Sequence, residues 1–389
     1  MKIEAVIGAN YGDEGKGLFT EYLCRNRPNP LVVLSNGGCQ RGHTVSNPET
    51  GIRHVFHHFG SGTLCGAPSV YSGTFLLNPI SYAAERQELS RFGISPIAFR
   101  SPECLLQLPC DMFANQTLEK SRGAKRHGSC GWGIWETQVR NNTHFKLTFE
   151  DFAAMDRAVK RRRLIEETEW TLENRLGKIK DQINDEIAKI LVSDKFCDHF
   201  IEDFEYMAKS AMPLETNVLP DVDWKRYGID AKTLIVENGQ GLLLDKKYAP
   251  ADENGRHDVH STPSMTGIDG VKAAVGTDFI PDLTVNYVSR TYFTRHGAGP
   301  FPEETPDMRF EDPTNIGNNY QGSMRFGKMT AELATKMLSR IQTDAKGCSE
   351  INLAFTHCNE VFPPEIEFPE DVYYSYEDDS EKITKRKSK

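Results

Sequence analysis

Short β-branched runs that each end in a glycine-containing or polar turn are the feature that most limits what this chain can fold into. We predict these runs to be strands, and they cover residues 3–8 (IEAVIG), 31–35 (LVVLS), 233–237 (TLIVE), 284–294 (TVNYVSRTYFT) and 351–355 (INLAF). Helical patterns separate them, which is typical of helices that flank a mostly parallel sheet. We therefore predict an α/β fold with a large, mostly parallel central sheet. Ligands of such sheets bind at the carboxyl ends of the strands, so the turns after these runs are the candidate site.

The length of 389 residues fits either one large α/β body with appendages or two domains. Residues 148–212 are charged, helical in pattern and poor in glycine, and they begin with a predicted capping box from Thr148 to Asp151. We interpret them as a helical insertion in a single domain over residues 1–372. The polar, charge-blocked residues 373–389 are expected to form a frayed tail.

Charge and composition exclude several classes of partner. The formal net charge is -9, which argues against a surface that binds nucleic acid through phosphate contacts. No stretch approaches the ~20 apolar residues of a membrane helix, and the sequence shows no basic-apolar leader. The nine cysteines are scattered without a CxxC pair. We expect a reduced cytoplasmic protein that has no disulfide framework, no structural zinc and no membrane partner.

The turn after the first predicted strand has the composition of a phosphate-binding loop without the Walker sequence. The Walker pattern fails because its first position is Asn10 and because Gly17 follows Lys16. The loop residues are Gly12, Asp13, Glu14, Gly15, Lys16 and Gly17, in which glycines let backbone N–H groups approach an anion. A carboxylate here repels phosphate unless a cation lies between them or it works as a base. Asp13 is therefore a candidate Mg²⁺ ligand and general base.

Three later turns carry further polar candidates. His43, between Gly42 and Thr44, is an acid/base candidate after the second strand, although a single histidine is more often structural. Gln240 lies between two glycines after the third strand, where its amide can orient a substrate amide or carbonyl. The turn RHGAGPFPEE follows the fourth strand. Each signal is weak alone, but four such turns at strand ends of one sheet favour a shared site.

At these turns the sequence resembles the adenylosuccinate synthetase family. The family's opening loop, Trp-Gly-Asp-Glu-Gly-Lys-Gly, is matched by residues 11–17, and its Gly-His-Thr turn by residues 42–44. The segments HHFGSGTL (57–64), RGAKRHGSCGWGI (122–134), GQGLLLD (239–245) and TRHGAGPFPEE (294–304) follow in family order. The resemblance covers roughly residues 3–360. It implies the P-loop-NTPase-like fold of that family, a carbon–nitrogen ligase and a homodimer.

The resemblance also implies a reaction in two steps. Asp13 removes the N1 proton of a 6-oxopurine monophosphate, and O6 then attacks the γ-phosphate of a nucleoside triphosphate to give a 6-phosphoryl intermediate. His43 stabilises the charge on O6 and on the transferring phosphoryl, while Lys16 and Mg²⁺ neutralise its equatorial oxygens. The amine of L-aspartate then displaces phosphate. By the same match Gln240 orients the purine, and Gly42 joins Asp13 as a metal ligand.

Further binding residues follow from the resemblance alone. Phosphate and nucleotide contacts are expected from Gly12, Glu14, Gly15, Gly17, Gln40, Arg41 and Thr44. Gly128, Ser129 and Cys130 stand where the family has a Gly-Thr-Thr turn that holds the 5′-phosphate, and Cys130 costs the turn one hydroxyl. Arg140 lies near the family position whose arginine reaches across a dimer interface to that phosphate.

Two departures from the family pattern concern the other substrates. The family normally uses GTP, and the Asp of a Thr-Lys-Leu-Asp turn accepts guanine N1–H and N2–H; here the turn is Thr356-His357-Cys358-Asn359. An Asn side chain complements the N1 and N6 edge of adenine, so ATP or dATP is the expected donor. The family's arginine-rich aspartate loop is shorter here and keeps only Arg325, with Arg295 as a possible second arginine.

These departures make the chain most similar to the bacteriophage branch of the family, the 2-aminoadenylosuccinate synthetases. The resemblance implies that aspartate is joined to GMP or dGMP on the way to diaminopurine for phage DNA, in the host cytoplasm if a phage encodes the chain. Asp13 is retained here, although some of these phage enzymes replace the loop aspartate. Two alternatives stay open: an adenylosuccinate synthetase that uses IMP and GTP in AMP biosynthesis, and a catalytically silent nucleotide-binding module.

Overall fold

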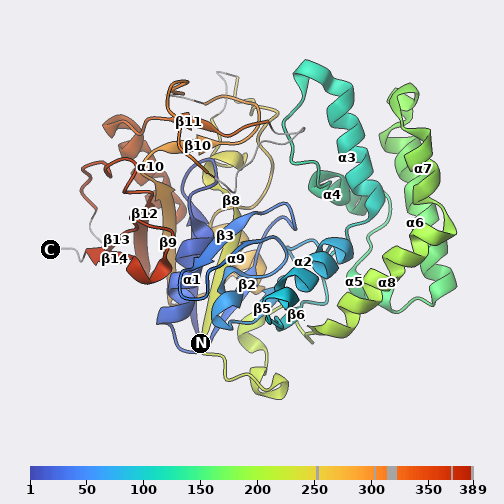
Figure 1. Cartoon of the computed structure of the whole chain (residues 1–389), viewed down its shortest axis with the longest axis horizontal. Helices are drawn as coiled ribbons and strands as arrows, with labels where there is room; N and C mark the ends of the chain where they lie inside the picture. Colours follow the sequence, from blue (N-terminus) through green and yellow to red (C-terminus); the bar gives the residue numbers. More distant parts are fainter. Residues whose placement is uncertain (251–253, 302–303, 313–321, 369–370, 387–389) are drawn as a thin grey trace.

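The computed structural model describes residues 1–250, 254–301, 304–312, 322–368 and 371–386. A ten-stranded sheet forms the centre of this part of the chain (Figure 1). In spatial order its strands are β14 (Thr384–Arg386), β13 (Val372–Tyr374), β12 (Glu350–Thr356), β9 (Leu283–Arg290), β1 (Lys2–Gly8), β8 (Thr233–Gly241), β2 (Pro30–Leu34), β5 (Ser69–Tyr71), β6 (Ala98–Arg100) and β7 (Ala211–Pro213). Neighbouring strands are parallel except for the antiparallel pair β13–β14. The predicted α/β fold is confirmed.

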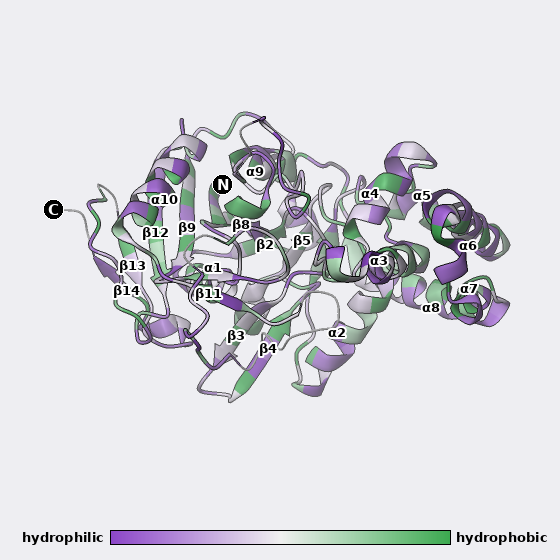
Figure 2. Cartoon of the chain, turned by 90° about the horizontal axis from the view of Figure 1, so that it is seen from above, coloured by the Kyte–Doolittle hydropathy of each residue, from purple (hydrophilic) through white to green (hydrophobic). Residues whose placement is uncertain are grey.

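Helices flank this sheet and fill the connections between its strands (Figure 2). They are α1 (Lys16–Asn26), α2 (Pro79–Arg91), α3 (Pro109–Arg122), α4 (Ile134–Thr143), α5 (Phe149–Ala153), α6 (Arg157–Trp170), α7 (Asp185–Leu191), α8 (Asp194–Ser210), α9 (Ile268–Val275) and α10 (Ala331–Asp344). Single turns are η1 (Ser61–Cys65), η2 (Gly123–Lys125), η3 (Thr171–Arg175), η4 (Gly177–Gln182), η5 (Leu219–Asp221), η6 (Trp224–Tyr227), η7 (Leu242–Leu244) and η8 (Ser380–Lys382). Among the described helices, none combines the length and the apolar character needed to span a membrane.

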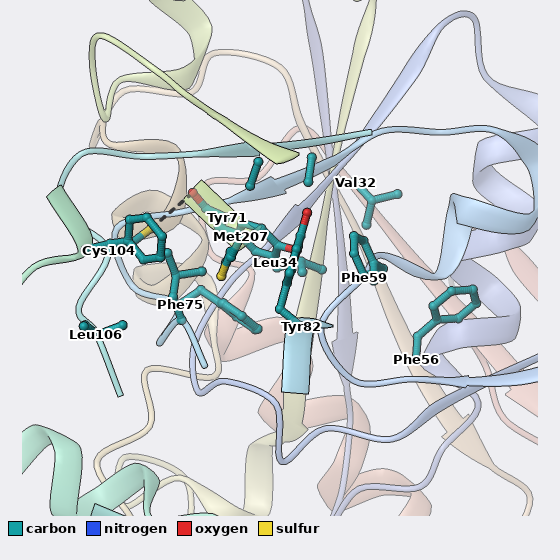
Figure 3. Packing of buried hydrophobic residues seen from close by; sticks show 14 of the residues in the cluster. Val32, Leu34, Phe56, Phe59, Tyr71, Phe75, Tyr82, Cys104, Leu106 and Met207 are labelled. Atoms are coloured by element: carbon teal, nitrogen blue, oxygen red, sulfur yellow. Dashed lines mark hydrogen bonds between the residues drawn. The ribbon is translucent and has the colours of Figure 1, made fainter. Parts of the chain in front are cut away.

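Burial on both faces explains why β1 lies in the middle of the sheet. Ile3, Ala5 and Ile7 point into an apolar cluster shared with α9 and α10, while Val6 joins the opposite cluster with α1 and α2. Such two-sided burial is typical of strands in parallel sheets. The cluster that contains Val6 continues toward β5 and α2, where aromatic side chains such as Tyr71 pack closely (Figure 3). The two clusters hold the strand ends, and hence the turns that follow them, in fixed positions.

The helical segment predicted near residues 148–212 is observed as α5 to α8, which gather with α3 and α4 beyond one edge of the sheet (Figure 1). The capping box is confirmed, because the Thr148 hydroxyl accepts a hydrogen bond from the Asp151 amide and the Asp151 carboxylate accepts one from the Thr148 amide. This arrangement satisfies backbone donors at the start of α5. The last helix of the segment ends at Ser210, and β7 follows directly at the sheet edge.

The predicted strand 284–294, and with it the place of the turn that follows, was wrong. The predicted strand 284–294 is divided: β9 ends at Arg290, and β10 (Phe293–Arg295) leaves the central sheet to pair with β11 (Arg325–Gly327). The turn RHGAGPFPEE therefore follows a small separate sheet, and its residues 302–303 lie outside the described residues. A second small sheet pairs β3 (His43–Asn47) with β4 (Ile52–Phe56).

The expected frayed tail is also wrong for residues 373–386. Val372 and Tyr373 are buried and continue the sheet as β13, which pairs with β12. The chain then returns as β14. Ser380 is buried on the way, and Arg25 of α1 forms an ion pair with Glu381. Pairing to an existing strand edge thus orders a segment whose composition alone predicts disorder; residues 387–389 lie outside the description.

Candidate active site

A cavity of about 1580 Å³ opens at the carboxyl ends of the central strands. Its walls include the turns after β1, β2, β8 and β12, as the strand pattern predicted. Nearly all of the residues singled out in the sequence line it: Gly12, Asp13, Glu14, Gly15, Lys16, Gly17, Gln40, Arg41, Gly42, His43, Thr44, Gly128, Ser129, Cys130, Gln240, Arg295 and Asn359. Arg140 and Arg325 do not belong to this lining.

The conformation of the first loop accommodates Glu14, the second of its two acidic side chains, beneath the loop. Glu14 turns back under the loop, where one carboxylate oxygen accepts the Asn10 amide at 2.6 Å and the other lies 3.2 Å from the Lys16 ammonium. A Cβ on Gly8 would lie 2.0 Å from this carboxylate, so glycine is required beside it. Glu14 is thus a buried partner of Lys16, and a phosphate that binds at the loop competes with it for the lysine.

Asp13 is the carboxylate of the loop that faces the cavity. Its φ of 56° places it in the left-handed region, between Gly12 and the start of α1. The His296 ring nitrogen lies 3.5 Å from its carboxylate, and Arg290 donates to its backbone carbonyl. The described residues contain no group of three His, Cys, Asp or Glu side chains that could hold a metal alone. The half-buried Asp13 carboxylate at the cavity fits Mg²⁺, which binds through one or two carboxylates and substrate phosphates.

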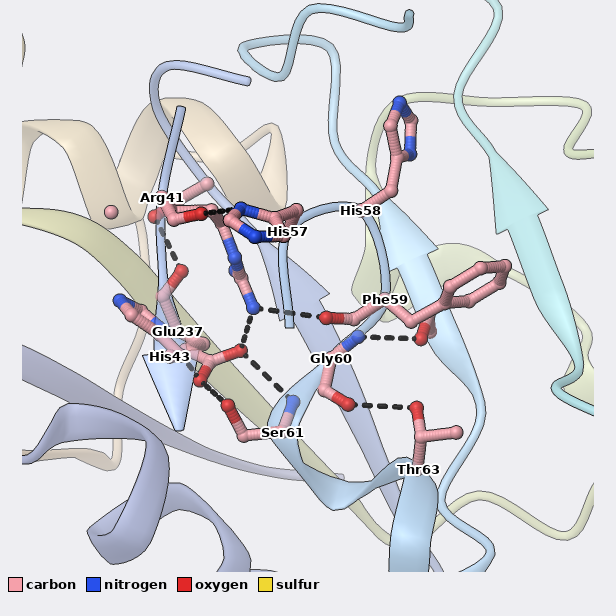
Figure 4. A network of polar contacts seen from close by, with 12 residues as sticks. Arg41, His43, His57, His58, Phe59, Gly60, Ser61, Thr63 and Glu237 are labelled. Carbon is pink, nitrogen blue, oxygen red and sulfur yellow. Dashed lines mark hydrogen bonds and ion pairs between the residues drawn. The ribbon is translucent and has the colours of Figure 1, made fainter. Parts of the chain in front are cut away.

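His43 is held by a buried carboxylate that the sequence analysis overlooked (Figure 4). Glu237, at the end of the apolar run of β8, accepts a hydrogen bond from His43 Nδ1 at 2.8 Å. Its other oxygen pairs with Arg41 at 2.6 Å, and both the amide and the hydroxyl of Ser61 donate to the same carboxylate. A glutamate inside a run as apolar as TLIVE was the signal available, because an acid is rarely buried without partners.

The surroundings keep His43 neutral. The pKa of His43 is lowered to about 4, chiefly by burial and next by the charge of Arg41, while the Glu237 carboxylate acts in the opposite direction. Burial alone would raise the pKa of Glu237, but Arg41 and His43 hold it well below its usual value. Since Nδ1 carries the proton that is donated to Glu237, Nε2 is the nitrogen that remains for a substrate.

Two glutamine side chains in the cavity wall carry polar atoms without a partner. Within the described residues, Gln240 Oε1 and Gln40 Nε2 are buried and make no hydrogen bond. The other end of the Gln40 amide is fixed, because its oxygen accepts the Gly38 amide at 2.7 Å. Buried polar atoms normally have partners, so these two atoms are available to a bound ligand.

The turn at residues 128–130 meets the turn after β10 through backbone contact. A Cβ on Gly128 would lie 2.6 Å from the Ala298 nitrogen, and both Gly128 and Gly297 have positive φ. Ser129 Oγ accepts a hydrogen bond from Asn115, and the Gly128 amide donates to Glu119 at 2.9 Å. The expected phosphate turn therefore lies at the cavity but has its first amide already occupied.

The expected role of Arg140 does not fit its position. Its side chain is buried inside the protein, where it makes two hydrogen bonds to the Asp111 carboxylate and one to the Leu106 carbonyl. An arginine that reaches across a subunit interface must be exposed on the subunit surface, so we correct this prediction. The guanidinium instead holds α4 against the start of α3.

Arg295 and Arg325 are brought together by the small β10–β11 sheet, in which they are direct partners. Arg325 lies over Phe301, and its guanidinium pairs with Glu304 and with the Gly297 and Gly299 carbonyls. Arg295 is the one that faces the cavity; burial lowers its pKa, and it lies over the Tyr11 ring. Residues 317–321 of the shortened loop lie outside the described residues.

The turn after β12 lies directly on the first loop. Thr356 Oγ1 donates to the Glu14 carbonyl at 2.9 Å, and a Cβ on Gly15 would lie 2.8 Å from the Thr356 methyl group. His357 has a φ of 60°, which bends the chain so that Asn359 is exposed in the cavity wall. Asn359 and the phosphate loop thus share one end of the cavity.

Comparison with known proteins shows which family the chain resembles. Residues 5–332 match the family model "Adenylosuccinate synthetase". The adenylosuccinate synthetase of Lactobacillus acidophilus is 26% identical over 325 residues, which are 82% of this chain and 69% of the relative. The chain spans between 62% and 69% of the length of the curated relatives it matches.

Two solved structures share the fold. Fully ligated adenylosuccinate synthetase from Plasmodium falciparum aligns with a TM-score of 0.64 at 16% identity, over 100% of this chain and 88% of the other. The succinoaminodeoxyadenylate synthetase of cyanophage S-2L, bound to dGMP and dATP, aligns with a TM-score of 0.61 at 13% identity, over 98% and 95%. The family match covers well over half of the chain, and this protein is therefore a member of the adenylosuccinate synthetase family of carbon–nitrogen ligases.

Proposed function

We propose that the protein joins L-aspartate to C6 of GMP or dGMP, with ATP or dATP as phosphate donor, to form 2-amino-N6-succinyl-(deoxy)adenylate for diaminopurine DNA. Asp13 accepts the N1 proton, and the electron pair passes to O6, which attacks the γ-phosphorus and expels ADP or dADP. The aspartate amine then attacks C6, the 6-phosphoryl group leaves as inorganic phosphate, and the nitrogen loses its proton. Guanine offers the same N1–H and O6 as hypoxanthine, so the 2-amino group leaves these steps unchanged.

The network at Glu237 supports a role for His43 in charge stabilisation. Its neutral ring donates from Nδ1 to Glu237, which leaves Nε2 for O6 and the transferring phosphoryl. Negative charge on the bound substrates raises the pKa of the ring, so His43 takes up a proton as they bind and then donates from Nε2. Lys16 adds positive charge at the same end of the cavity. Mg²⁺, held by Asp13 and the backbone of Gly42, would supply further positive charge to the phosphates.

The choice of phosphate donor in this proposal depends on Asn359. It lines the cavity beside the phosphate loop, where the resemblance implies that an Asp recognises guanine. The Asn amide offers one donor and one acceptor, which match adenine N1 and N6 and leave one guanine donor unpaired. Two nearby glutamates are engaged elsewhere: Glu360 with Tyr292 and Glu377 with Lys382. The cyanophage structure supports the proposal because that protein accommodates dGMP and dATP within the same fold.

A second candidate is the ordinary reaction with IMP and GTP. The matched curated relatives carry that family name, and Asp13 is retained. Asp378, an exposed carboxylate in the same wall, is the group that could accept guanine N1–H and N2–H in place of the missing Asp. A catalytically silent module is disfavoured because Asp13, Lys16 and His43 all line the cavity.

A phosphate-release assay that crosses IMP, GMP and dGMP with GTP, ATP and dATP, with aspartate and Mg²⁺ present, tests the proposal. We expect ATP or dATP to be preferred over GTP by about tenfold or more, since one unpaired buried polar group costs ~1 to 3 kcal/mol. Asn359→Asp should narrow this preference. Asp378→Asn is the matched control and should leave the ratio unchanged. A wild-type preference for GTP that Asp378→Asn abolishes would instead establish the second candidate.

We also propose that the protein is a homodimer, as the family resemblance implies. Light scattering coupled to size-exclusion chromatography tests this directly, because the chain mass of 43.9 kDa distinguishes monomer from dimer. A monomer at micromolar concentration would contradict the proposal.

A further inference from the structure

The loop between β13 and β14 forms part of the cavity wall at the end that holds the turn after β12. Tyr376, Glu377 and Asp378 of this loop line the same cavity as Asn359. The composition of this loop predicts a frayed tail, so sequence analysis alone does not place it in the cavity wall. Its position therefore adds groups to the site that neither the motifs nor the family resemblance assign.

Backbone pairing fixes this loop against the turn after β12. The Ser375 amide donates to the Phe355 carbonyl at 2.8 Å, and the Cys358 amide donates to the Ser375 carbonyl at 3.0 Å. Tyr376 and Asn359 are the next residues of these two paired segments. The loop is held further along as well, since Asp379 forms a β-bridge with Ser46 of β3. The aromatic ring is consequently attached to a well-supported backbone beside Asn359.

The Tyr376 side chain has the features of an unused stacking surface. It is 44% exposed although it lies in a cavity wall, and among the described residues no other ring or cation packs on it. Elsewhere in the structure tyrosine rings such as Tyr373 and Tyr22 pack against neighbouring aromatics. A tyrosine ring offers a rigid planar face at low entropy cost, which suits contact with a planar ligand.

We propose that Tyr376 stacks on the base of the nucleoside triphosphate donor while Asn359 hydrogen-bonds to its edge. This inference rests on the proposed function, in which the donor base lies at the turn after β12. The β13–β14 loop thereby supplies a base contact from the same cavity wall that holds Asn359. Stacking on an aromatic side chain is tolerant of base identity, so Tyr376 contributes affinity and Asn359 contributes selectivity.

Equilibrium titration of the full chain with non-hydrolysable ATP analogue and Mg²⁺ tests the proposal. Loss of one base–aromatic contact weakens binding by about 5- to 150-fold, so we expect this change in Kd for Tyr376→Ala and near wild-type binding for Tyr376→Phe. Inorganic tripolyphosphate has no base, and its Kd should be the same in all three proteins. Tyr206→Ala, which removes a tyrosine of 45% exposure on α8, is the matched control and should bind like wild type.

The ligand comparison separates stacking from a structural role. If Tyr376 only supported the loop, Tyr376→Ala would weaken tripolyphosphate and the ATP analogue alike, or neither, and either result would overturn the proposal. Tyr376→Leu keeps the apolar volume and serves if the alanine variant does not fold; it should also lose base-dependent binding. The GTP analogue distinguishes the two proposals: if GTP is the true donor, Tyr376→Ala weakens its binding by the same factor, and only the assignment of Asn359 fails.

Discussion

Replacement of Arg41 by methionine removes the positive charge that neutralises Glu237, and we expect the pKa of His43 to rise as a result. In the native protein burial is the largest cause of the low pKa of His43, and the charge of Arg41 is the next. Methionine keeps an unbranched apolar stem but has no charged group. The Arg41→Met variant therefore isolates the contribution of the charge.

The magnitude follows from the geometry of the shared carboxylate. Arg41 and His43 bind opposite oxygens of Glu237 at 2.6 and 2.8 Å. The two positive charges would thus lie roughly 7 Å apart, which at an effective dielectric constant of about 20 is a repulsion of ~2.4 kcal/mol. Its removal raises the pKa by about 2 units, from about 4 to about 6.

An NMR titration of histidine ring carbons labelled with ¹³C measures this pKa, and the resonance lost in His43→Asn assigns the signal. Arg41→Lys is the matched control, because it keeps the charge and should leave the pKa near 4. A His43 pKa that stays near 4 in folded Arg41→Met would refute the reasoning, since burial alone would then account for the neutral ring. A rise in both variants would point to altered burial.

Three further predictions concern catalysis and stability. If Asp13 is the general base, Asp13→Ala lowers turnover by about 10² to 10⁴ in a phosphate-release assay of folded protein, and near-normal turnover contradicts that role. Because the folded pKa of His43 lies below its unfolded value of ~6.5, its contribution to the free energy of unfolding is complete above that pH and falls by about 3 kcal/mol as the pH approaches 4. In urea titrations the free energy of unfolding of His43→Asn should therefore fall less steeply with acid than that of wild type. An unchanged slope would exclude this linkage. Arg140→Met leaves Asp111 buried without its cation and should cost about 3 to 5 kcal/mol in a urea titration, with normal turnover of the folded fraction; a loss of turnover at full stability would restore a role in the site.

The central strands and the loop glycines could be predicted because their signals are local. Residues 3–8 form a run that is apolar except for Glu4, and the following loop needs glycines wherever the backbone approaches a ligand or another turn. These two patterns were sufficient to place Asp13, His43 and Gln240 around one cavity. The turn after β10 does line the cavity, as predicted, but β10 belongs to the small β10–β11 sheet and not to the central sheet.

The missed features all depend on partners distant in sequence. Glu237 looks like an isolated acid in a strand, because its partners Arg41 and His43 lie 196 and 194 residues away in the sequence. Arg140 was assigned a phosphate contact from its position in the sequence, whereas its side chain pairs with Asp111 of another helix. The tail became ordered because the edge of β12 offers hydrogen bonds to β13, which no composition rule contains.

The central position of β1 makes the protein vulnerable while it is being synthesised. This first strand pairs with β8 and β9, whose pairing begins at Thr233 and Leu283. At about 5 to 20 residues per second, a ribosome needs roughly 15 to 60 s to produce those partners, and the apolar strand has no permanent neighbour until then. The nucleotide loop therefore takes its final shape late, although it is made first. Rapid translation or a chaperone that binds the nascent amino-terminal strand should raise the yield of active protein, whereas stabilising α1 alone should not.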